Sequence, residues 1–322
     1  MCIAVWTLEH PDYALILGEN RDEFLDRPTQ NAHWHNFDQD LENAEEGILS
    51  GRDVKAGGSW FGLNKDGRVA LLTNITEPLG QYKSTRGYLI SSFLSSRSSH
   101  PLEDELGTIV APDSVFAGFN LLLLAPSLRP DTNSISYESL FVTNHGGGGV
   151  LTSRSLAPSE RACGCMSNGW TAKELTTGPK SGHAIDDFTA VLHTLQHQQQ
   201  GDGLEAAATY HRGDLESKLV DGLFSLRNTV QVAPIPIVLE AQLGTASAHT
   251  KIPTVYGTRL STVLLIKRTG EIYFVERDIW VVHPEPPTQR EFRFKLDLDA
   301  IRKSESAPGD LDTAARSVMG SV

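Results

Sequence analysis

Cys2 directly follows the initiator Met1, so it can take part in a reaction that is closed to an internal cysteine. A small residue in second position permits removal of Met1, which leaves a free α-amine and a thiol on one residue. The amine, with an ordinary pKa of ~7.7–8.0, can then serve as base for a thiol of pKa ~8.5. Cys2 is therefore a candidate nucleophile that needs no catalytic histidine. The alternative is a small hydrophobic residue at the start of a strand.

A short polar segment, Gly-Glu-Asn-Arg-Asp at 18–22, ends the second apolar run of the chain. The pattern predicts a turn that brings Asn20, Arg21 and Asp22 beside the beginning of the first strand. A carboxylate in that place would orient the α-ammonium, and Arg21 would lower the pKa of the thiol or bind an anionic substrate group. A solvated salt bridge in the turn is the alternative.

The elements that must position these residues are short strand pairs and a few helices. Residues 2–8 and 13–18 predict an N-terminal hairpin around His-Pro-Asp at 10–12. The other predicted strands are 57–64 with 68–74, 116–124 with 139–144, 262–266 with 271–277, and 292–296. Apolar residues at helical spacing predict helices at 85–95, 184–198 and 215–226.

Three segments lack a periodic pattern. Residues 19–51 are expected to be an irregular loop with short elements, and His-Gly-Gly-Gly-Gly at 145–149 a loose hairpin end. The chain after residue 302 is rich in Ser, Ala, Gly and Asp. We expect one domain over 1–302 and a disordered tail over 303–322. Strand pairs with helices grouped between them indicate an α+β fold, or a layered α/β/β/α fold, and not a Rossmann crossover pattern.

Composition excludes several classes of protein. The formal net charge of −12 over 322 residues argues against nucleic-acid binding. The longest apolar runs fall short of the ~20 residues that a membrane-spanning helix needs. The N-terminus has the features of neither a secretory signal nor a transit peptide. Three cysteines give no disulfide framework, which favours a reducing compartment. We expect a cytoplasmic protein.

Several separate motifs, in order, carry a resemblance to a known family. They are Met-Cys-Ile at 1–3, Asn-Arg-Asp-Glu at 20–23, Arg-Pro at 27–28, Gly-Gly-Ser-Trp-Phe-Gly at 57–62, Leu-Thr-Asn at 72–74 and Tyr-Gly-Thr-Arg at 256–259. Over roughly residues 1–280 the chain resembles the NRDE family, also called the Transport and Golgi organisation 2 (TANGO2) family. That family is similar to the N-terminal-nucleophile (Ntn) cysteine hydrolases, which include penicillin V acylase and bile salt hydrolase.

The resemblance implies an Ntn-hydrolase-like four-layer αββα sandwich and a set of site residues. Cys2 would be the nucleophile and Asp22 its orienting carboxylate. Asn74 and Asn168 match polar positions near the site, where an amide N–H suits an oxyanion hole. Arg259 would be the remaining site cation. The less specific alternatives are a turn cap for Asn74 and a surface ion pair for Arg259.

The segment at 18–22 also departs from the hydrolase pattern. Where those enzymes have an arginine, this chain has Glu19, which places an anion where a cation should assist the thiolate. Arg21 is a nearby cation, but strand alternation is expected to direct it to the opposite face. Asn20, Arg21 and Trp60 are the predicted substrate-binding residues, with core packing as the alternative for Trp60.

Two functions of different class follow from the resemblance. The first is an amide or thioester hydrolase or acyltransferase that acts through Cys2. The second is a non-catalytic ligand-binding protein in secretory transport and Golgi organisation, lipid (acyl-CoA) metabolism or haem mobilisation, and Glu19 favours it. A Golgi or mitochondrial association is the corresponding alternative for localisation.

The expected partner is a small molecule with an acyl or amide group, with haem or acyl-CoA as special cases. No cofactor or metal is predicted, since Cys163 and Cys165 lack a second ligand pair at metal-binding spacing. For haem, only His33, His35 and His145 offer axial ligands, and only in principle.

Overall fold

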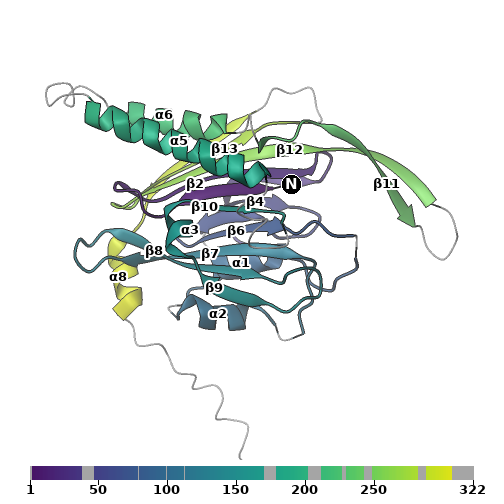
Figure 1. The fold of residues 1–322 in the computed structure, drawn as a ribbon. Coiled ribbons are helices and arrows are strands. Elements are labelled where there is room, and N and C mark those ends of the chain that lie inside the picture. Colours follow the sequence, from purple (N-terminus) through teal and green to yellow (C-terminus); the bar gives the residue numbers. More distant parts are fainter. Residues whose placement is uncertain are drawn as a thin grey trace, which may run out of the picture.

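The fold is known from a computed structural model, which describes residues 2–37, 47–78, 80–98, 100–111, 113–169, 179–201, 212–226, 230–242, 249–281 and 288–306. Strands dominate, and they form two antiparallel sheets (Figure 1).

Sheet 1 places the N-terminal strand in its interior, in the order β10-β1-β2-β12-β13-β14, with β11 paired to the first part of β12. Its strands are β1 (Ile3–Thr7), β2 (Tyr13–Phe24), β10 (Gly164–Ser167), β11 (Ile235–Gln242), β12 (His249–Lys267), β13 (Glu271–Asp278) and β14 (Gln289–Lys295). The start of β1 therefore has a neighbour on each side, β10 and β2.

Sheet 2 is a meander in which each strand pairs with the next along the chain, in the order β3-β4-β5-β6-β7-β8-β9. Its strands are β3 (Thr29–His35), β4 (Ile48–Asp53), β5 (Phe61–Asn64), β6 (Val69–Asn74), β7 (Phe119–Leu128), β8 (Ile135–Thr143) and β9 (Thr152–Ser155). Strands β5 and β6, the first part of β7 and the second part of β8 are mostly apolar and buried, as expected for strands covered on both sides.

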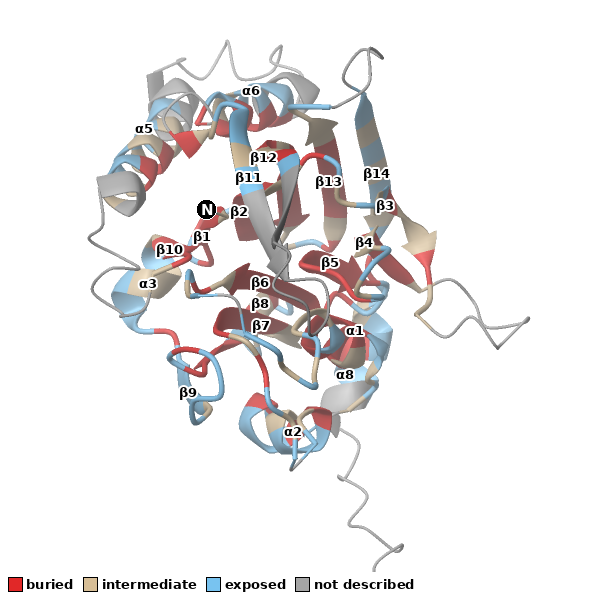
Figure 2. Cartoon of the chain, turned by 90° about the vertical axis from the view of Figure 1, so that its right-hand side faces the viewer, coloured by how far each residue is buried: buried red, intermediate tan, exposed pale blue. Residues whose placement is uncertain are grey.

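Helices cover the outer face of each sheet, which gives four layers (Figures 1 and 2). Helices α5 (Pro179–Gly201) and α6 (Arg212–Ser225) pack on sheet 1, and α1 (Gly87–Ser95) and α2 (Leu102–Ile109) pack on sheet 2. The largest apolar cluster fills the space between the sheets, with Trp6, Phe61 and Phe274 among its members. The α+β class and the αββα layer order expected from the resemblance are thus the observed ones.

The segment 19–51 was predicted wrongly as an irregular loop. Strand β2 continues through Phe24, and β3 and β4 follow within the same segment; residues 38–46 lie outside the described part of the chain. The polar run at 18–22 is a strand interior and not a turn, because β1 and β12 pair with it on both sides. Polarity suggested exposure, but residues 19–22 are all buried.

The glycine run at 145–149 is held in place. His145, Gly146 and Gly148 have positive φ, and the carboxylate of Glu77 accepts hydrogen bonds from the N–H groups of Gly118 and Gly147, each at 2.7 Å. The predicted loose end is therefore a turn held by hydrogen bonds to Glu77, and two glycines at positive φ allow its backbone conformation.

Two short helices complete the described fold: α3 (Pro158–Ala162) before β10, and α8 (Leu298–Ser306), which crosses the expected boundary at residue 302. The rest of the expected tail, 307–322, lies outside the described residues. Within the described chain, no helix combines the length and the apolar character needed to cross a bilayer.

Candidate active site

The strand registers place Cys2 between two of the predicted site residues. Ile3 pairs with Asn20 of β2 on one side and with Ser167 of β10 on the other. One residue earlier, Cys2 therefore lies opposite Arg21 and Asn168. Directly opposed residues in antiparallel strands point to the same face. Cys2, Arg21 and Asn168 thus share one row, on the face that looks toward sheet 2.

The thiol of Cys2 is half-buried and donates to the backbone carbonyl of Asp22 at an Sγ–O distance of 3.6 Å. The Tyr256 hydroxyl donates to the same carbonyl at 3.2 Å. Burial, with the nearby Asp22 carboxylate as a second cause, raises the pKa of the Cys2 thiol to about 12. The chain that retains Met1 therefore holds Cys2 as a neutral thiol at physiological pH.

The carboxylate of Asp22 is directed toward β12. Asp22 pairs with Thr258, whose hydroxyl donates to Asp22 Oδ1 and also accepts the N–H of Val232 at 2.8 Å. Asp22 is 4% exposed, so this carboxylate is fixed by buried contacts. By strand alternation it lies on the face opposite to Arg21, although its charge still acts on the Cys2 thiol.

Glu19 and Arg21 share a face, contrary to the expectation that alternation would separate them. They are two residues apart, and both contact Trp60: the indole N–H donates to Glu19 Oε1 at 3.2 Å, and the Arg21 guanidinium lies 3.8 Å above the indole ring. Arg21 also donates to Thr29 Oγ1 at 2.9 Å. Trp60 thus supports the two charged side chains from sheet 2.

Glu19 is one member of a polar row that crosses four strands. The registers align it with Thr262, Glu276 and Arg290. Thr262 Oγ1 donates to Glu19 Oε1 at 3.2 Å, and Arg290 pairs with Glu276 at 2.9 Å. Burial raises the pKa of Glu19 to about 8, since desolvation outweighs the hydrogen bond from Trp60. Glu19 is therefore largely protonated at neutral pH and is not the full anion that the sequence suggested.

The two predicted asparagines lie at the ends of β6 and β10, where these two strands contact each other. Thr73 Oγ1 donates to Ser167 O at 2.8 Å, and Thr76 N donates to Asn168 O at 3.3 Å. Asn74 lies between these two contacts along the chain. Among the described residues, the Asn74 side chain has no hydrogen-bond partner, and the buried Oδ1 of Asn168 is likewise unpaired. Asn168 is thus opposite Cys2, and Asn74 ends the strand that contacts Ser167 and Asn168.

Arg259 occupies a bulge in β12, between the pairs Thr258–Asp22 and Leu260–Arg21. Its Nη1 donates to the carbonyls of Leu25 and Arg27, the first at 3.1 Å. Burial and the nearby Arg21 cation lower the pKa of Arg259. The contacts show Arg259 holding the chain that follows β2.

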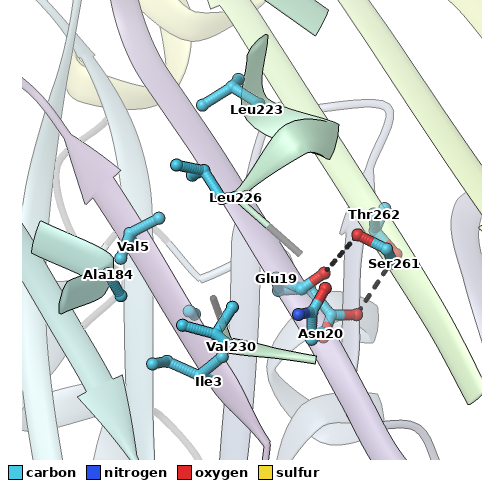
Figure 3. Close-up of a pocket in the computed structure, with 12 residues that line it drawn as sticks. Ile3, Val5, Glu19, Asn20, Ala184, Leu223, Leu226, Val230, Ser261 and Thr262 are labelled. Atoms are coloured by element: carbon cyan, nitrogen blue, oxygen red, sulfur yellow. Dashed lines mark hydrogen bonds between the residues drawn. The ribbon is translucent and has the colours of Figure 1, made fainter. Parts of the chain in front are cut away.

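Asn20 faces away from Cys2. It lines a narrow crevice between sheet 1 and helices α5 and α6, together with Ile3, Val5, Leu223, Leu226 and Val230 (Figure 3). Figure 3 also shows Glu19 in its contacts with Thr262 and Ser261 across β12. Of the three predicted substrate-binding residues, Asn20 is thus on one face of β2, and Arg21 and Trp60 meet on the other.

Two residues near Cys2 were not identified as site residues from the sequence. Tyr256 belongs to a quoted motif, and its hydroxyl shares the Asp22 carbonyl with the thiol. Arg86 directly precedes α1 and donates to Gly118 O at 2.8 Å. Burial lowers the pKa of Arg86, and the charges of Glu77, Glu23 and Cys2 oppose this shift. No pattern in the sequence connects residue 86 with residue 2.

The model of the family Transport and Golgi organisation 2 (TANGO2) matches residues 1–280. This chain belongs to that family. It is 27% identical over 293 residues to the Transport and Golgi organization protein 2 homolog of Bos taurus, which covers 88% of this chain and 94% of the relative. It is 28% identical over 275 residues to the Mus musculus homolog, with 83% and 87% covered.

Two solved structures resemble this TANGO2-family chain distantly. A Caenorhabditis elegans N-acylethanolamine-hydrolyzing acid amidase ortholog aligns with a TM-score of 0.41 and 9% identity over 82% of this chain and 92% of that one. The C2A mutant of the conjugated bile acid hydrolase from Clostridium perfringens aligns with a TM-score of 0.39 and 10% identity over 92% and 98%.

Of the three histidines named for haem, His33 and His35 lie side by side and His145 lies apart from them. His33 and His35 lie on β3, an edge strand of sheet 2, whereas His145 follows β8, five strands away. Both ring nitrogens of His35 have partners, Asn36 O and Ser50 Oγ. Cys163 contacts Thr189, and Cys165 lies in the apolar cluster beneath α5. Among the described residues, no group of three or more His, Cys, Asp or Glu could hold a metal ion.

Proposed function

We propose that this protein is an Ntn-type cysteine hydrolase or acyltransferase that cleaves an amide or thioester, with Cys2 as nucleophile after loss of Met1. The observation that carries the proposal is the row Asn168–Cys2–Arg21, with the unpartnered amide of Asn74 beside it. A nucleophile, hydrogen-bond donors and a cation converge there from β1, β2, β6 and β10. The buried Oδ1 of Asn168 has no hydrogen-bond partner among the described residues, which is unusual for a buried polar atom at a position that serves packing alone.

The reaction follows from these positions. The α-amine of Cys2 takes the thiol proton as the sulfur attacks the substrate carbonyl, and an S–C bond forms. The amide groups of Asn74 and Asn168 donate to the oxyanion. The C–N or C–S bond then breaks, and the ammonium returns its proton to the leaving amine or thiol. Water, or another acceptor, attacks the thioester on Cys2, releases the acyl group and restores the thiol.

Removal of Met1 is the step that activates the site. It places a positive charge on Cys2 itself, which opposes the burial that raises the thiol pKa to about 12. Asp22, whose charge acts on the Cys2 thiol and whose carboxylate accepts from Thr258, is the group that would hold that ammonium. Arg21 lies opposite Cys2 and is the cation on the face where the hydrolases have their arginine.

Intact mass spectrometry of protein purified from its own cell tests the proposal. Met1 should be absent, and iodoacetamide should label Cys2 well before Cys163, whose thiol pKa burial also raises. A panel of acyl amides and thioesters should then yield product with wild type and none with Cys2→Ala. Retention of Met1, or a Cys2 that reacts no faster than Cys163, would refute the hydrolase.

A second candidate function is binding of an acyl ligand, such as acyl-CoA, without turnover. The observation that favours it is the neutral thiol of the form that retains Met1. In that case Cys2→Ala would bind the same acyl amide or thioester as wild type, and neither protein would release product.

A further inference from the structure

Arg86 reaches the site from outside the two strands that carry Cys2. Its Nη1 donates to the carbonyl of Gly118 at 2.8 Å, and the same carbonyl accepts the N–H of Ile75 at 2.9 Å. Ile75 follows Asn74 directly, and Asn74 pairs with Phe119. The guanidinium is thereby fixed at the end of β6, next to the unpartnered amide of Asn74.

The same end of β6 lies against the Cys2 row. Thr76 N donates to Asn168 O at 3.3 Å, and Asn168 is opposite Cys2. A series of neighbouring contacts therefore connects Arg86, through Gly118 and the end of β6, with Asn168 and the Cys2 row. The electrostatic influence of the Cys2 thiol on the pKa of Arg86 agrees with this placement.

Most hydrogen-bond donors of Arg86 have no protein partner. A guanidinium carries five N–H groups, and among the described residues only Gly118 O accepts one of them, while no ion pair forms. The nearest carboxylates are already engaged: Glu77 accepts two backbone N–H groups, and Glu23 accepts the N–H of Phe24 and faces Arg21 at 3.7 Å.

The other described arginines near Cys2 have more contacts with protein groups than Arg86 has. Arg27 forms a bidentate pair with Asp53, at 2.7 and 3.2 Å. Arg259 caps two backbone carbonyls, and Arg21 lies on Trp60 with one donor on Thr29. Arg86 is half-buried, and its planar guanidinium has paired N–H groups that no described residue accepts from. Such paired donors match the two oxygens of a carboxylate or phosphate.

We propose that Arg86 binds an oxyanion group of the substrate, a carboxylate or a phosphate, so that the protein selects anionic acyl compounds. This specificity rests on the proposed function, since it describes which substrate reaches Cys2. The pairing of Arg86 with the anion would position the scissile carbonyl between Cys2 and the two asparagines.

Alkylation of Cys2 by an anionic and by a neutral reagent measures the preference for anions, and it does not require the substrate to be known. Protein that begins at Cys2 is treated with iodoacetate, which carries a carboxylate, or with the neutral iodoacetamide. In each reaction the sulfur–carbon bond forms and iodide leaves. The ratio of the two rates cancels any change in the amount of thiolate. Arg86→Gln should lower the ratio of iodoacetate to iodoacetamide rates about tenfold, as expected for loss of one charge-assisted contact.

Arg97→Gln is the matched control, because Arg97 is an exposed arginine just beyond the other end of α1 and its loss changes the net charge equally. Arg97→Gln should leave the ratio of the two rates unchanged. Arg86→Lys should give an intermediate ratio, since lysine keeps the positive charge but lacks the paired N–H donors of a guanidinium. An equal ratio in wild type and Arg86→Gln would overturn the proposal.

A binding measurement separates this inference from the question of catalysis. In Cys2→Ala protein, isothermal titration calorimetry compares hexanoylglycine with its methyl ester and with hexyl phosphate. Either anion should bind about tenfold more tightly than the ester, and adding Arg86→Gln should remove that preference. Whichever of the two anions binds more tightly shows whether the site prefers a carboxylate or a phosphate. Equal binding of all three compounds, or no binding of any, would overturn the anion site even if Cys2 proved to be an active nucleophile.

Discussion

Glu19→Gln should change how the stability of this protein depends on pH. Glutamine has nearly the same size as glutamate, and its carbonyl oxygen can still accept from Trp60 Nε1 and Thr262 Oγ1. What the substitution removes is the titration of a buried group. Because Glu19 is 4% exposed, solvent screens its charge very little.

The sign and size follow from the raised pKa of Glu19, about 8 in the folded protein against an ordinary 4.5. Between these values the folded chain keeps a proton that the unfolded chain has lost, so the free energy of unfolding falls as the pH rises. Above about pH 8, Glu19 is ionised in both states, and the free energy of unfolding has fallen by its full amount. A difference of roughly 3.5 pKa units, at 1.36 kcal/mol each, gives a destabilisation of about 3–5 kcal/mol at alkaline pH.

Urea unfolding followed by tryptophan fluorescence at pH 5, 7 and 9 measures this difference. Glu19→Gln should match wild type within about 1 kcal/mol at pH 5 and exceed it by about 3 kcal/mol or more at pH 9. Some pH dependence should remain, since burial also raises the pKa of Glu276. Glu103→Gln, at an exposed site on α2, is the control for the change in charge. Parallel pH curves for wild type and Glu19→Gln would refute the reasoning.

Two further substitutions test the packing that positions the site. Gly51→Ala would place a Cβ 2.4 Å from the Trp60 ring, so we expect a loss of about 1–3 kcal/mol in urea unfolding; a Gly107→Ala protein, with open space around that position, should show no such loss. Thr258→Val removes the donor to Asp22 and the acceptor for Val232, which should cost about 1–3 kcal/mol and slow iodoacetamide labelling of Cys2. Labelling as fast as in wild type would contradict a positioning role for Thr258.

Local patterns predicted the elements whose own residues decide them. Asp66-Gly67 between two apolar runs predicted the hairpin of β5 and β6, and Thr269-Gly270 that of β12 and β13. In both turns the glycine has positive φ, which few other residues tolerate. The helices α1, α5 and α6 were likewise expected from apolar residues at helical spacing.

The polar half of β2 could not be predicted in this way. Residues 19–22 have the composition of a turn, but they are buried because β1 and β12 pair with them and Trp60, Thr258 and Thr262 satisfy their side chains. Those partners come from positions 60 to 262. Polar residues can be buried wherever distant residues supply their hydrogen bonds, so polarity alone does not predict exposure.

The sequence by itself determined the residue types at the site and the family to which the chain belongs, because both depend on order along the chain. It named Cys2, Asp22, Asn74, Asn168 and Arg259 as site residues, and their roles stay predictions. Only the tertiary structure decided which of them meet. Register places Cys2 opposite Arg21 and Asn168, strand alternation turns Asn20 to the other face, and the contact between β6 and β10 brings in Asn74. It also placed Arg86 against Gly118, beside the end of β6 that contacts β10, and such packing of distant segments leaves no local pattern in the chain.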